Sequence, residues 1–260
     1  MRSGSDPRVL LHFHPDWPHL GSTVIEAMRR AGRYRSQFET GTSNGGLTAH
    51  IGGDRWQWES RLFNGRYDSR PADERPVYGS LDLGDRYGAA FRFGSSFLRL
   101  TAEASSRATF CYPDSVFDPP GVTGADGVAR WITRMEGDDL DVLDRYVEAH
   151  VHGGLNLAAD VECIVLDKCF RGTSVHDEAT RIGVTVNFHP GFRVVTQELD
   201  PTYRGEEYSA LAQLLGDELT PDMLGAAARS ARYDPQALKR VWHLLARFGR
   251  DPESATAELS

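Results

Sequence analysis

Lysine is almost missing from this chain. Only Lys168 and Lys239 occur among 260 residues, and the other basic residues are arginines. The formal net charge is −8, whereas a general nucleic-acid-binding surface needs clustered basic side chains to contact phosphates. We therefore expect no nucleic-acid partner. The hydrophobic content of 40% and the charged content of 25% are typical of a globular protein with one large domain, or one domain with an appendage.

Long hydrophobic runs are also absent. No segment approaches the about 20 apolar residues that a membrane-spanning helix requires, so we expect no membrane contact. Residues 1–8, MRSGSDPR, contain no apolar stretch of the kind found in secretory signals. This predicts a cytoplasmic protein, or one that a specialised secretion system exports without a Sec signal.

Cysteine is scarce as well. The three cysteines, Cys111, Cys163 and Cys169, do not make an even disulfide framework, and they lack the paired spacing of cysteine zinc sites. Cys163 lies in an apolar run and is expected in the core. The cysteine pattern therefore predicts neither a disulfide scaffold nor a structural zinc site.

Glycine, in contrast, is abundant, and 26 glycines favour a strand-rich body with many turns. We expect a helix over residues 22–30 and strands within the ranges 8–14, 75–83, 89–100, 157–166 and 182–195. From about residue 200 the apolar residues recur with helical period, which predicts helices over 206–216, 219–232 and 235–248. The pattern predicts an α+β protein with a body over 8–199 and a helical segment over 200–252.

Two regions are harder to assign. Residues 109–137 are rich in proline, glycine and aspartate, so we expect a long loop or small insertion with one helix around 128–135. Residues 53–67, GDRWQWESRLFNGRY, alternate aromatic and polar side chains, which predicts strands or turns packed at the surface. Trp56 and Trp58 are expected to contribute to the core.

The stretch 146–154, YVEAHVHGG, contains the most unusual arrangement of titratable side chains. On a β-strand Glu148, His150 and His152 share one face, together with Tyr146, because successive side chains alternate between faces. Burying three such groups is costly unless they are paired. A strand that borders a cleft explains the pattern, and the solvated face of an edge strand explains it equally well.

Small polar residues gather at two further places. Residues 41–46, GTSNGG, offer backbone N–H groups and hydroxyls that suit a phosphate or ribose, although a hairpin turn at Asn44 and Gly45 is the simpler explanation. Ser95 and Ser96 follow Gly94 in an apolar segment. A buried serine pair either bonds to the backbone or lines a pocket.

Several motifs occur in an order that resembles a known family. They are LHFHPD, SQFETGTSNGG, RPVYGSLDL, FGSSFLRL, YVEAHVHG and DVECIVLD, between about residues 8 and 195. The chain resembles a bacterial family, first described as a domain of unknown function, that contains the CteC-like effectors. Those effectors are mono-ADP-ribosyltransferases that modify a threonine of ubiquitin.

The resemblance implies a fold and a reaction. ADP-ribosyltransferases have a split, strongly bent β-sandwich that binds NAD in a central cleft. They are glycosyltransferases of the pentosyl class, and many are toxins. A glutamate bonds the nicotinamide ribose and stabilises positive charge as nicotinamide leaves, an electrostatic effect that depends on a partly dry site. We therefore expect NAD as the co-substrate.

The resemblance also assigns roles to residues. Glu148 matches the catalytic glutamate, His14 takes the first-strand position, and Ser95 with Ser96 matches the second-strand serine motif. The full set expected to bind NAD is His14, Gln37, Phe38, Thr42, Ser43, Asn44, Gly45, Phe93, Gly94, Ser95 and Ser96.

The acceptor is expected to be a protein hydroxyl. Tyr146 stands where many toxins have the first glutamate or glutamine of Glu-x-Glu or Gln-x-Glu, and this departure weakens the case for transfer to arginine. A threonine of ubiquitin follows from the resemblance alone. We expect the protein to be a monomer. His150, or His152, takes the proton from the hydroxyl or else makes a structural hydrogen bond.

Other functions remain open at this point. A serine hydrolase is a weak alternative because no Gly-x-Ser-x-Gly motif occurs. A metal-dependent hydrolase using His14, Glu148, His150 and His152 is compatible with the spacing. The third alternative is a non-catalytic nucleotide-binding module.

Overall fold

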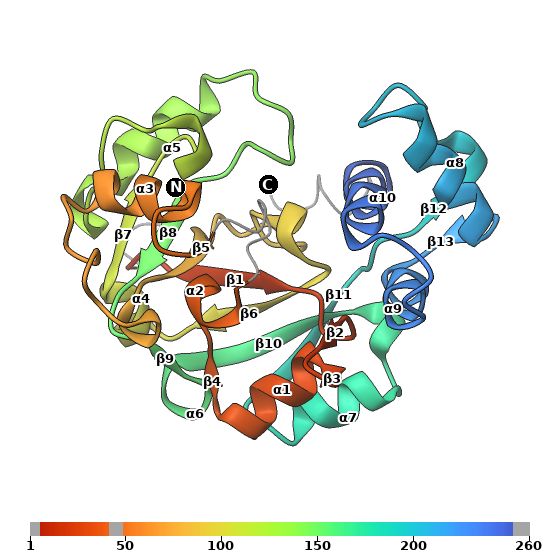
Figure 1. The fold of residues 1–260 in the computed structure, drawn as a ribbon, viewed down its shortest axis with the longest axis horizontal. Helices are drawn as coiled ribbons and strands as arrows, with labels where there is room; N and C mark the ends of the chain where they lie inside the picture. The colour runs from red at the N-terminus through yellow and green to blue at the C-terminus, as the bar shows by residue number, and fades with distance from the viewer. Residues whose placement is uncertain (1–5, 42–48, 252–260) are drawn as a thin grey trace. The chain divides into compact units, whose positions relative to one another are not determined.

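The structure is a computed structural model that describes residues 6–41 and 49–251. It confirms the α+β class, with a large mixed sheet and several helices (Figure 1). The seven strands of this sheet follow the order β11-β10-β6-β1-β5-β8-β7. The pairs β1–β5, β5–β8 and β8–β7 are antiparallel, and β10 pairs parallel with β11.

The strands of the sheet are β1 (Val9–Phe13), β5 (Val77–Leu81), β6 (Ser96–Leu100), β7 (Ala108–Cys111), β8 (Glu148–Val151), β10 (Val161–Asp167) and β11 (Thr185–His189). Short pairs are formed by β2 (Pro18–His19) with β3 (Ser22–Thr23), β4 (Arg33–Tyr34) with β9 (Leu155–Asn156), and β12 (Val194–Val195) with β13 (Glu218–Leu219).

The α-helices are α1 (Val24–Ala31), α2 (Gln37–Thr40), α3 (Asp54–Leu62), α4 (Ala102–Ser106), α5 (Val128–Glu136), α6 (Leu157–Asp160), α7 (Ser174–Thr180), α8 (Glu206–Leu215), α9 (Pro221–Arg229) and α10 (Pro235–Phe248). Single 3₁₀ turns are η1 (Ala72–Glu74), η2 (Phe91–Phe93), η3 (Ser115–Phe117), η4 (Ala125–Gly127), η5 (Lys168–Phe170) and η6 (Thr196–Glu198). Within the described residues, no helix has the length and apolar character needed to cross a membrane.

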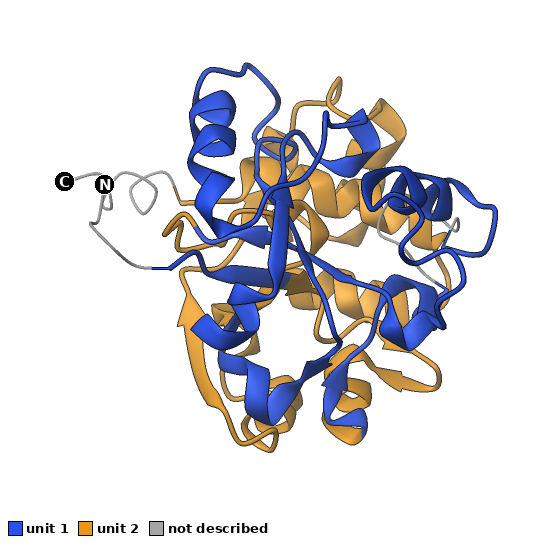
Figure 2. Cartoon of the chain, turned by 90° about the vertical axis from the view of Figure 1, so that its left-hand side faces the viewer, with its two compact units in different colours: residues 1–11, 31–82, 99–162 blue, residues 12–30, 83–98, 163–260 orange. Residues whose placement is uncertain are grey.

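The chain divides into two compact units (Figure 2). Unit 1 comprises residues 1–11, 31–82 and 99–162, and unit 2 comprises residues 12–30, 83–98 and 163–260. Strands β1, β6 and β10 each contribute residues to both units. Glu148 and the groups bonded to it belong to unit 1.

Unit 1 is built on the antiparallel strands β5, β8 and β7 with the start of β1. In β8 the side chains of Glu148, Ala149, His150 and Val151 are all buried, and neighbouring strands pair with β8 on both sides. The apolar side chains of Ala149 and Val151 face the core, as the alternation predicts.

Unit 2 contains the strand pair β10–β11 and the helices α8, α9 and α10. The predicted C-terminal helices are present, and α10 lies beside both α8 and α9 (Figure 1). Helices α9 and α10 start with proline at Pro221 and Pro235, the first-turn position where its missing N–H costs least. Trp242 of α10 is fully buried.

The prediction of strands or turns over residues 53–67 is wrong. Residues Asp54–Leu62 form helix α3, whose buried positions are Arg55 and Glu59. These two residues lie four apart on one face of the helix, so the buried face is charged. A search for apolar periodicity does not detect such a face, which explains the error.

Two other segments differ from expectation. Residues 89–100 do not form one strand, because the turn η2 precedes β6. The irregular region 109–137 begins with strand β7, which pairs with β8, and ends in α5 close to the predicted helix.

Candidate functional site

Strand β8 carries the candidate site. Glu148 lies opposite Ser80 of β5 and Cys111 of β7, and His150 lies opposite Tyr78 and Thr109. Directly opposed residues on antiparallel strands share a face, so these side chains converge. Glu148 is 4% exposed and His150 is 0% exposed. The alternative of a solvated edge strand is therefore wrong, because β8 is interior and both groups are buried.

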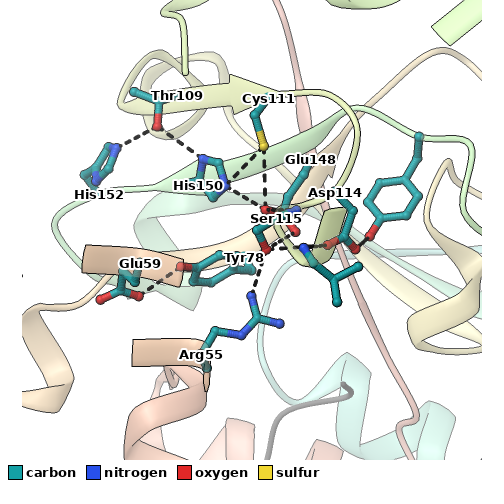
Figure 3. A network of polar contacts seen from close by, with 12 residues as sticks. Arg55, Glu59, Tyr78, Thr109, Cys111, Asp114, Ser115, Glu148, His150 and His152 are labelled. Carbon is teal, nitrogen blue, oxygen red and sulfur yellow. Dashed lines mark hydrogen bonds and ion pairs between the residues drawn. The ribbon is translucent and has the colours of Figure 1, made fainter. Parts of the chain in front are cut away.

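Glu148 receives hydrogen bonds on both of its oxygens (Figure 3). His150 Nε2 lies 2.8 Å from Oε1, and the Ser115 hydroxyl donates to Oε2 over 3.2 Å. The backbone N–H of Ser115 also donates to Oε1, over 3.3 Å. A carboxylate that accepts several hydrogen bonds is stabilised in its ionised form.

A buried arginine completes this arrangement. Arg55 of α3 is 7% exposed, and its Nη1 donates to the Ser115 hydroxyl over 3.1 Å. The guanidinium carbon lies 4.7 Å from the centre of the Tyr78 ring. Ser115 therefore bridges a buried cation and a buried carboxylate, and helix α3 supplies the positive charge.

The two buried carboxyl groups near Ser115 are shifted in opposite directions. Desolvation would raise the pKa of Glu148, but the hydrogen bond and charge of His150 and the charge of Arg55 lower it below its ordinary value. The pKa of Asp114 is raised by its burial and by the negative charge of Glu148. The Tyr146 hydroxyl donates a hydrogen bond to Asp114. Such opposite shifts are typical of sites that need one ionised and one protonated carboxyl.

A chain of hydrogen bonds leads away from Glu148 through the histidines. Thr109 Oγ1 lies 3.3 Å from His150 Nδ1 and 3.0 Å from His152 Nε2. His152 Nδ1 lies 2.6 Å from the Tyr67 hydroxyl. Burial, followed by the charges of His150 and Arg66, lowers the pKa of His152 to about 4. The expectation that both histidines lie on the same side as Glu148 is confirmed.

Two of the four residues of the metal-hydrolase alternative meet here. Glu148 and His150 are bonded, whereas both nitrogens of His152 bond to hydroxyls. A third side chain that could hold a metal ion beside Glu148 and His150 is Cys111. Its Sγ lies 3.8 Å from Glu148 Oε1 and 3.8 Å from His150 Nε2.

One buried hydroxyl beside the site has no partner in the described part of the chain. Ser80 is 0% exposed, and its Oγ has no hydrogen-bond partner among the described residues. It stands directly opposite Glu148 in the β5–β8 register. Buried polar atoms nearly always have partners, so an unpaired hydroxyl at this position is available to a ligand or water.

Gln37 and Phe38 lie on α2 in the same unit. The Phe38 ring packs on the guanidinium of Arg75, 4.1 Å from the ring centre. Arg75 forms a buried ion pair with Glu59, which also accepts a hydrogen bond of 2.9 Å from Tyr78. Thr42, Ser43, Asn44 and Gly45 lie outside the described residues.

The other residues expected to bind NAD belong to unit 2. The His14 ring stacks on Trp17 at 4.3 Å and meets the edge of Trp242 at 4.7 Å. Burial and the charges of Lys239 and His12 lower the pKa of His14 to about 3, so its imidazole is neutral at pH 7.

Bonding to the backbone explains one member of the serine pair. Ser96 Oγ accepts a hydrogen bond of 3.2 Å from the backbone of Asp167, whereas the buried Ser95 hydroxyl has no partner within the described part of the chain. Gly94, which follows Phe93 of η2, is needed for space, because a Cβ atom there would lie 2.3–2.5 Å from backbone atoms of Phe13.

A comparison with family models identifies the chain's relatives. The model of DUF3626, described as a protein of unknown function, matches residues 8–126 and 121–248. The chain belongs to the DUF3626 family. The two matches together include the candidate site in unit 1 and the C-terminal helices of unit 2. A search of curated proteins gave no match.

Sequence reasoning missed several residues that surround Glu148 in this DUF3626 protein. Arg55 lies on a helix that was expected to be strands or turns, and Asp114 and Ser115 lie in the irregular region. Cys111 was assigned no role because it lacks a neighbouring cysteine. Only the strand register brings it to Glu148, and register between distant strands leaves no local signal.

Proposed function

We propose that the chain is an NAD-dependent mono-ADP-ribosyltransferase that modifies a hydroxyl side chain of a protein. Glu148 carries the chemistry. The supporting observation is a buried carboxylate that stays ionised because His150, Ser115 and Arg55 stabilise it. A fixed negative charge in a dry site stabilises a neighbouring positive charge far better than one in water does.

Two groups at this position offer hydrogen bonds to a ribose. Glu148 has an oxygen to accept a hydrogen bond from a sugar hydroxyl, and Ser80 opposite it is a buried hydroxyl without a partner in the described chain. NAD would supply ADP-ribose, whose bond to nicotinamide breaks in the reaction. The family resemblance adds Gln37 and Phe38 of the same unit to the proposed binding set.

A hydroxyl acceptor needs a route for its proton. His150 lies beside Glu148, and Thr109 connects it to His152. The lowered pKa of the half-buried His152 keeps its imidazole neutral at pH 7, so it would pass a proton on between its two hydroxyl partners rather than hold it. We propose that this series of hydrogen bonds conducts the proton away from the site. Tyr146 is engaged with Asp114 and presents no carboxylate to an arginine acceptor.

Three finer points of the proposal rest on the family resemblance. They are a split, bent β-sandwich as the fold, a threonine of ubiquitin as the acceptor, and a role as a bacterial effector or toxin. Ubiquitin is consequently the first acceptor to test.

The test is transfer of label from NAD. Purified protein is incubated with labelled NAD, ubiquitin and a panel of other proteins, and the wild type is compared with Glu148→Ala. We expect labelled acceptor with the wild type and loss of labelling with the variant. Equal labelling by both proteins would remove Glu148 from the reaction.

Two other results would replace the proposal. NAD affinity in calorimetry without nicotinamide release would show a binding module. Hydrolytic activity that is abolished by EDTA and indifferent to NAD would show a metal-dependent hydrolase.

A further inference from the structure

Three side chains of different chemistry meet at one buried point in unit 1. They are Cys111, Glu148 and His150, whose exposed fractions are 0%, 4% and 0%. Cys111 Sγ lies 3.8 Å from Glu148 Oε1 and 3.8 Å from His150 Nε2, and Oε1 lies 2.8 Å from Nε2. Figure 3 shows the three side chains pointing toward one another from β7 and β8. These atoms form a compact triangle of potential metal ligands.

The backbone holds this triangle in place. Cys111 and Glu148 are direct register partners on paired strands, and His150 follows two residues later on the same face. The positions therefore depend on the sheet ladder, whose strands β7 and β8 pair over four residues each. A site on paired strands is more rigid than one on loops.

The distances suit a tetrahedral zinc ion. Zinc bonds of about 2.0 Å to nitrogen and oxygen and about 2.3 Å to sulfur place the donor atoms about 3.3–3.6 Å apart. Movements of about half an ångström would bring the observed separations of 3.8, 3.8 and 2.8 Å to these values. Thiolate and imidazole donors favour zinc over magnesium or calcium, which prefer oxygen ligands.

The surroundings also resemble those of metal sites. Thr109 Oγ1 contacts Nδ1 of His150, which leaves Nε2 to face the triangle. The Ser115 hydroxyl donates to Glu148 Oε2, the oxygen that does not belong to the triangle. Metal ligands usually have such hydrogen-bonded partners behind them. Three protein ligands leave a fourth position for water, as in catalytic zinc sites.

We propose that Cys111, Glu148 and His150 form a binding site for Zn²⁺. On binding, the Cys111 thiol gives up its proton to solvent and the sulfur bonds to the metal, so each ion bound releases a proton. Because Glu148 becomes a ligand, the bound ion removes its negative charge from the proposed reaction. This second consequence, inhibition by zinc, rests on the proposed function.

The test of binding uses Co²⁺ as a spectroscopic substitute for Zn²⁺, with the full chain in its reduced form. We expect one Co²⁺ per chain, with the near-ultraviolet absorption of a cobalt–thiolate bond and visible bands of tetrahedral intensity. Zn²⁺ should displace it, and Mg²⁺ should not. This measurement on the wild type does not depend on the folding of any variant.

Variants identify the ligands. Cys111→Ser should weaken binding at least about 100-fold, whereas Cys163→Ser and Cys169→Ser serve as matched controls and should bind as the wild type does. His150→Gln should also lose binding, while His152→Gln should retain it. Wild type without a cobalt–thiolate band, or Cys111→Ser with unchanged affinity, would overturn the proposal.

Inhibition is measured separately, as the ratio of nicotinamide release with and without Zn²⁺ in each protein. The wild type should lose most of its activity when one ion is bound. Cys111→Ser should release nicotinamide at the same rate with and without Zn²⁺. Zinc binding without any NAD turnover would refute the proposed function alone. NAD turnover without zinc binding would refute the metal site alone.

Discussion

At the scale of single residues, the most informative feature is the group of charged and polar side chains buried around Glu148. Burying an unpaired charge is costly, and each of these groups has partners that offset the cost. His150, Ser115 and Arg55 keep Glu148 ionised, while Asp114 nearby is shifted toward its protonated form. This opposition is the physical reason for placing catalysis at Glu148.

The first prediction concerns the hydrogen-bonded chain from His150 to His152. Thr109→Val keeps the shape of the side chain and removes the hydroxyl that links the two imidazoles. If protons leave along this series of hydrogen bonds, transfer of ADP-ribose to a hydroxyl acceptor should slow at least about tenfold. The measurement is the pH profile of the transfer rate with saturating NAD.

Thr109→Ser is the matched control, because it retains the hydroxyl and should restore both the rate and the profile. A valine variant whose rate and pH profile equal those of the wild type would show that the contacts of Thr109 are purely structural.

The second prediction concerns His243, a buried imidazole in α10. It is 1% exposed, neither ring nitrogen has a partner among the described residues, and burial with the charges of Arg92 and Arg204 lowers its pKa to about 2. Replacing an unsatisfied polar group by an apolar one removes a desolvation penalty. His243→Met should therefore raise the free energy of unfolding by about 1 kcal/mol at pH 7.

The difference in unfolding free energy between His243→Met and the wild type should increase at acidic pH. Below the ordinary histidine pKa of about 6.5, the unfolded wild type binds a proton at His243 that the folded protein does not bind, so wild-type stability falls. At pH 5 this adds about 2 kcal/mol to the difference. Urea unfolding at both pH values measures it, with the exposed His50→Met as control. A difference that stays constant with pH would contradict the account.

At the scale of elements, helix α3 shows how a charged face is buried. Glu59 and Arg75 form an ion pair with side-chain exposures of 0% and 3%. Leaving one partner of a buried pair alone costs about 3–5 kcal/mol, whereas replacing both with apolar side chains is often nearly neutral.

The third prediction follows from this pair. Glu59→Leu should lower the free energy of unfolding by about 3 kcal/mol, because it leaves Arg75 buried without its carboxylate. The double variant Glu59→Leu/Arg75→Met should recover part of that loss, and a double-mutant cycle by urea unfolding measures the coupling. The exposed pair Arg70 and Glu74 provides a control with coupling below about 1 kcal/mol. Additive effects in the buried cycle would be the contrary result.

The elements also show what the sequence could and could not predict. Strand β8 was predictable because Glu148 and His150 alternate with Ala149 and Val151, and the C-terminal helices were predictable from their apolar period. Helix α3 was not, because its buried face is charged.

The candidate site was predictable only in part, for a related reason. Glu148 and His150 belong to one strand, so a local pattern was sufficient to place them together. Cys111, Ser115 and Arg55 reach them through strand register, a turn and a helix contact, and none of these is encoded in a short stretch of sequence.

At the scale of the whole molecule, the family match and the division into units both include the C-terminal helices. Trp242 of α10 donates a hydrogen bond of 2.9 Å to the backbone of Arg92 and packs edge-on against Phe192 at 5.1 Å. Helix α10 is therefore part of the core of unit 2.

The fourth prediction is that Trp242 is essential to unit 2. Trp242→Ala should cost about 3–5 kcal/mol of unfolding free energy through loss of buried contacts and the cavity left behind. Trp242→Phe, which keeps an aromatic ring and loses the N–H donor and part of the indole volume, should cost clearly less. Calorimetry of the thermal transition compares them. An alanine variant that unfolds at the wild-type temperature would show that α10 contributes little to the unit.

The fifth prediction tests the central claim most directly. Glu148→Gln keeps the size of the side chain and removes its charge, and the measurement is the rate of nicotinamide release from NAD by purified protein. Because losing one preorganised electrostatic group typically costs about 100- to 1,000-fold, we expect a decrease of that size with the fold retained. Glu162→Gln, which alters a partly exposed carboxylate of unit 1 paired with Arg8, should release nicotinamide at the wild-type rate. Equal rates for the wild type and Glu148→Gln, or no release by the wild type with any acceptor, would contradict the account.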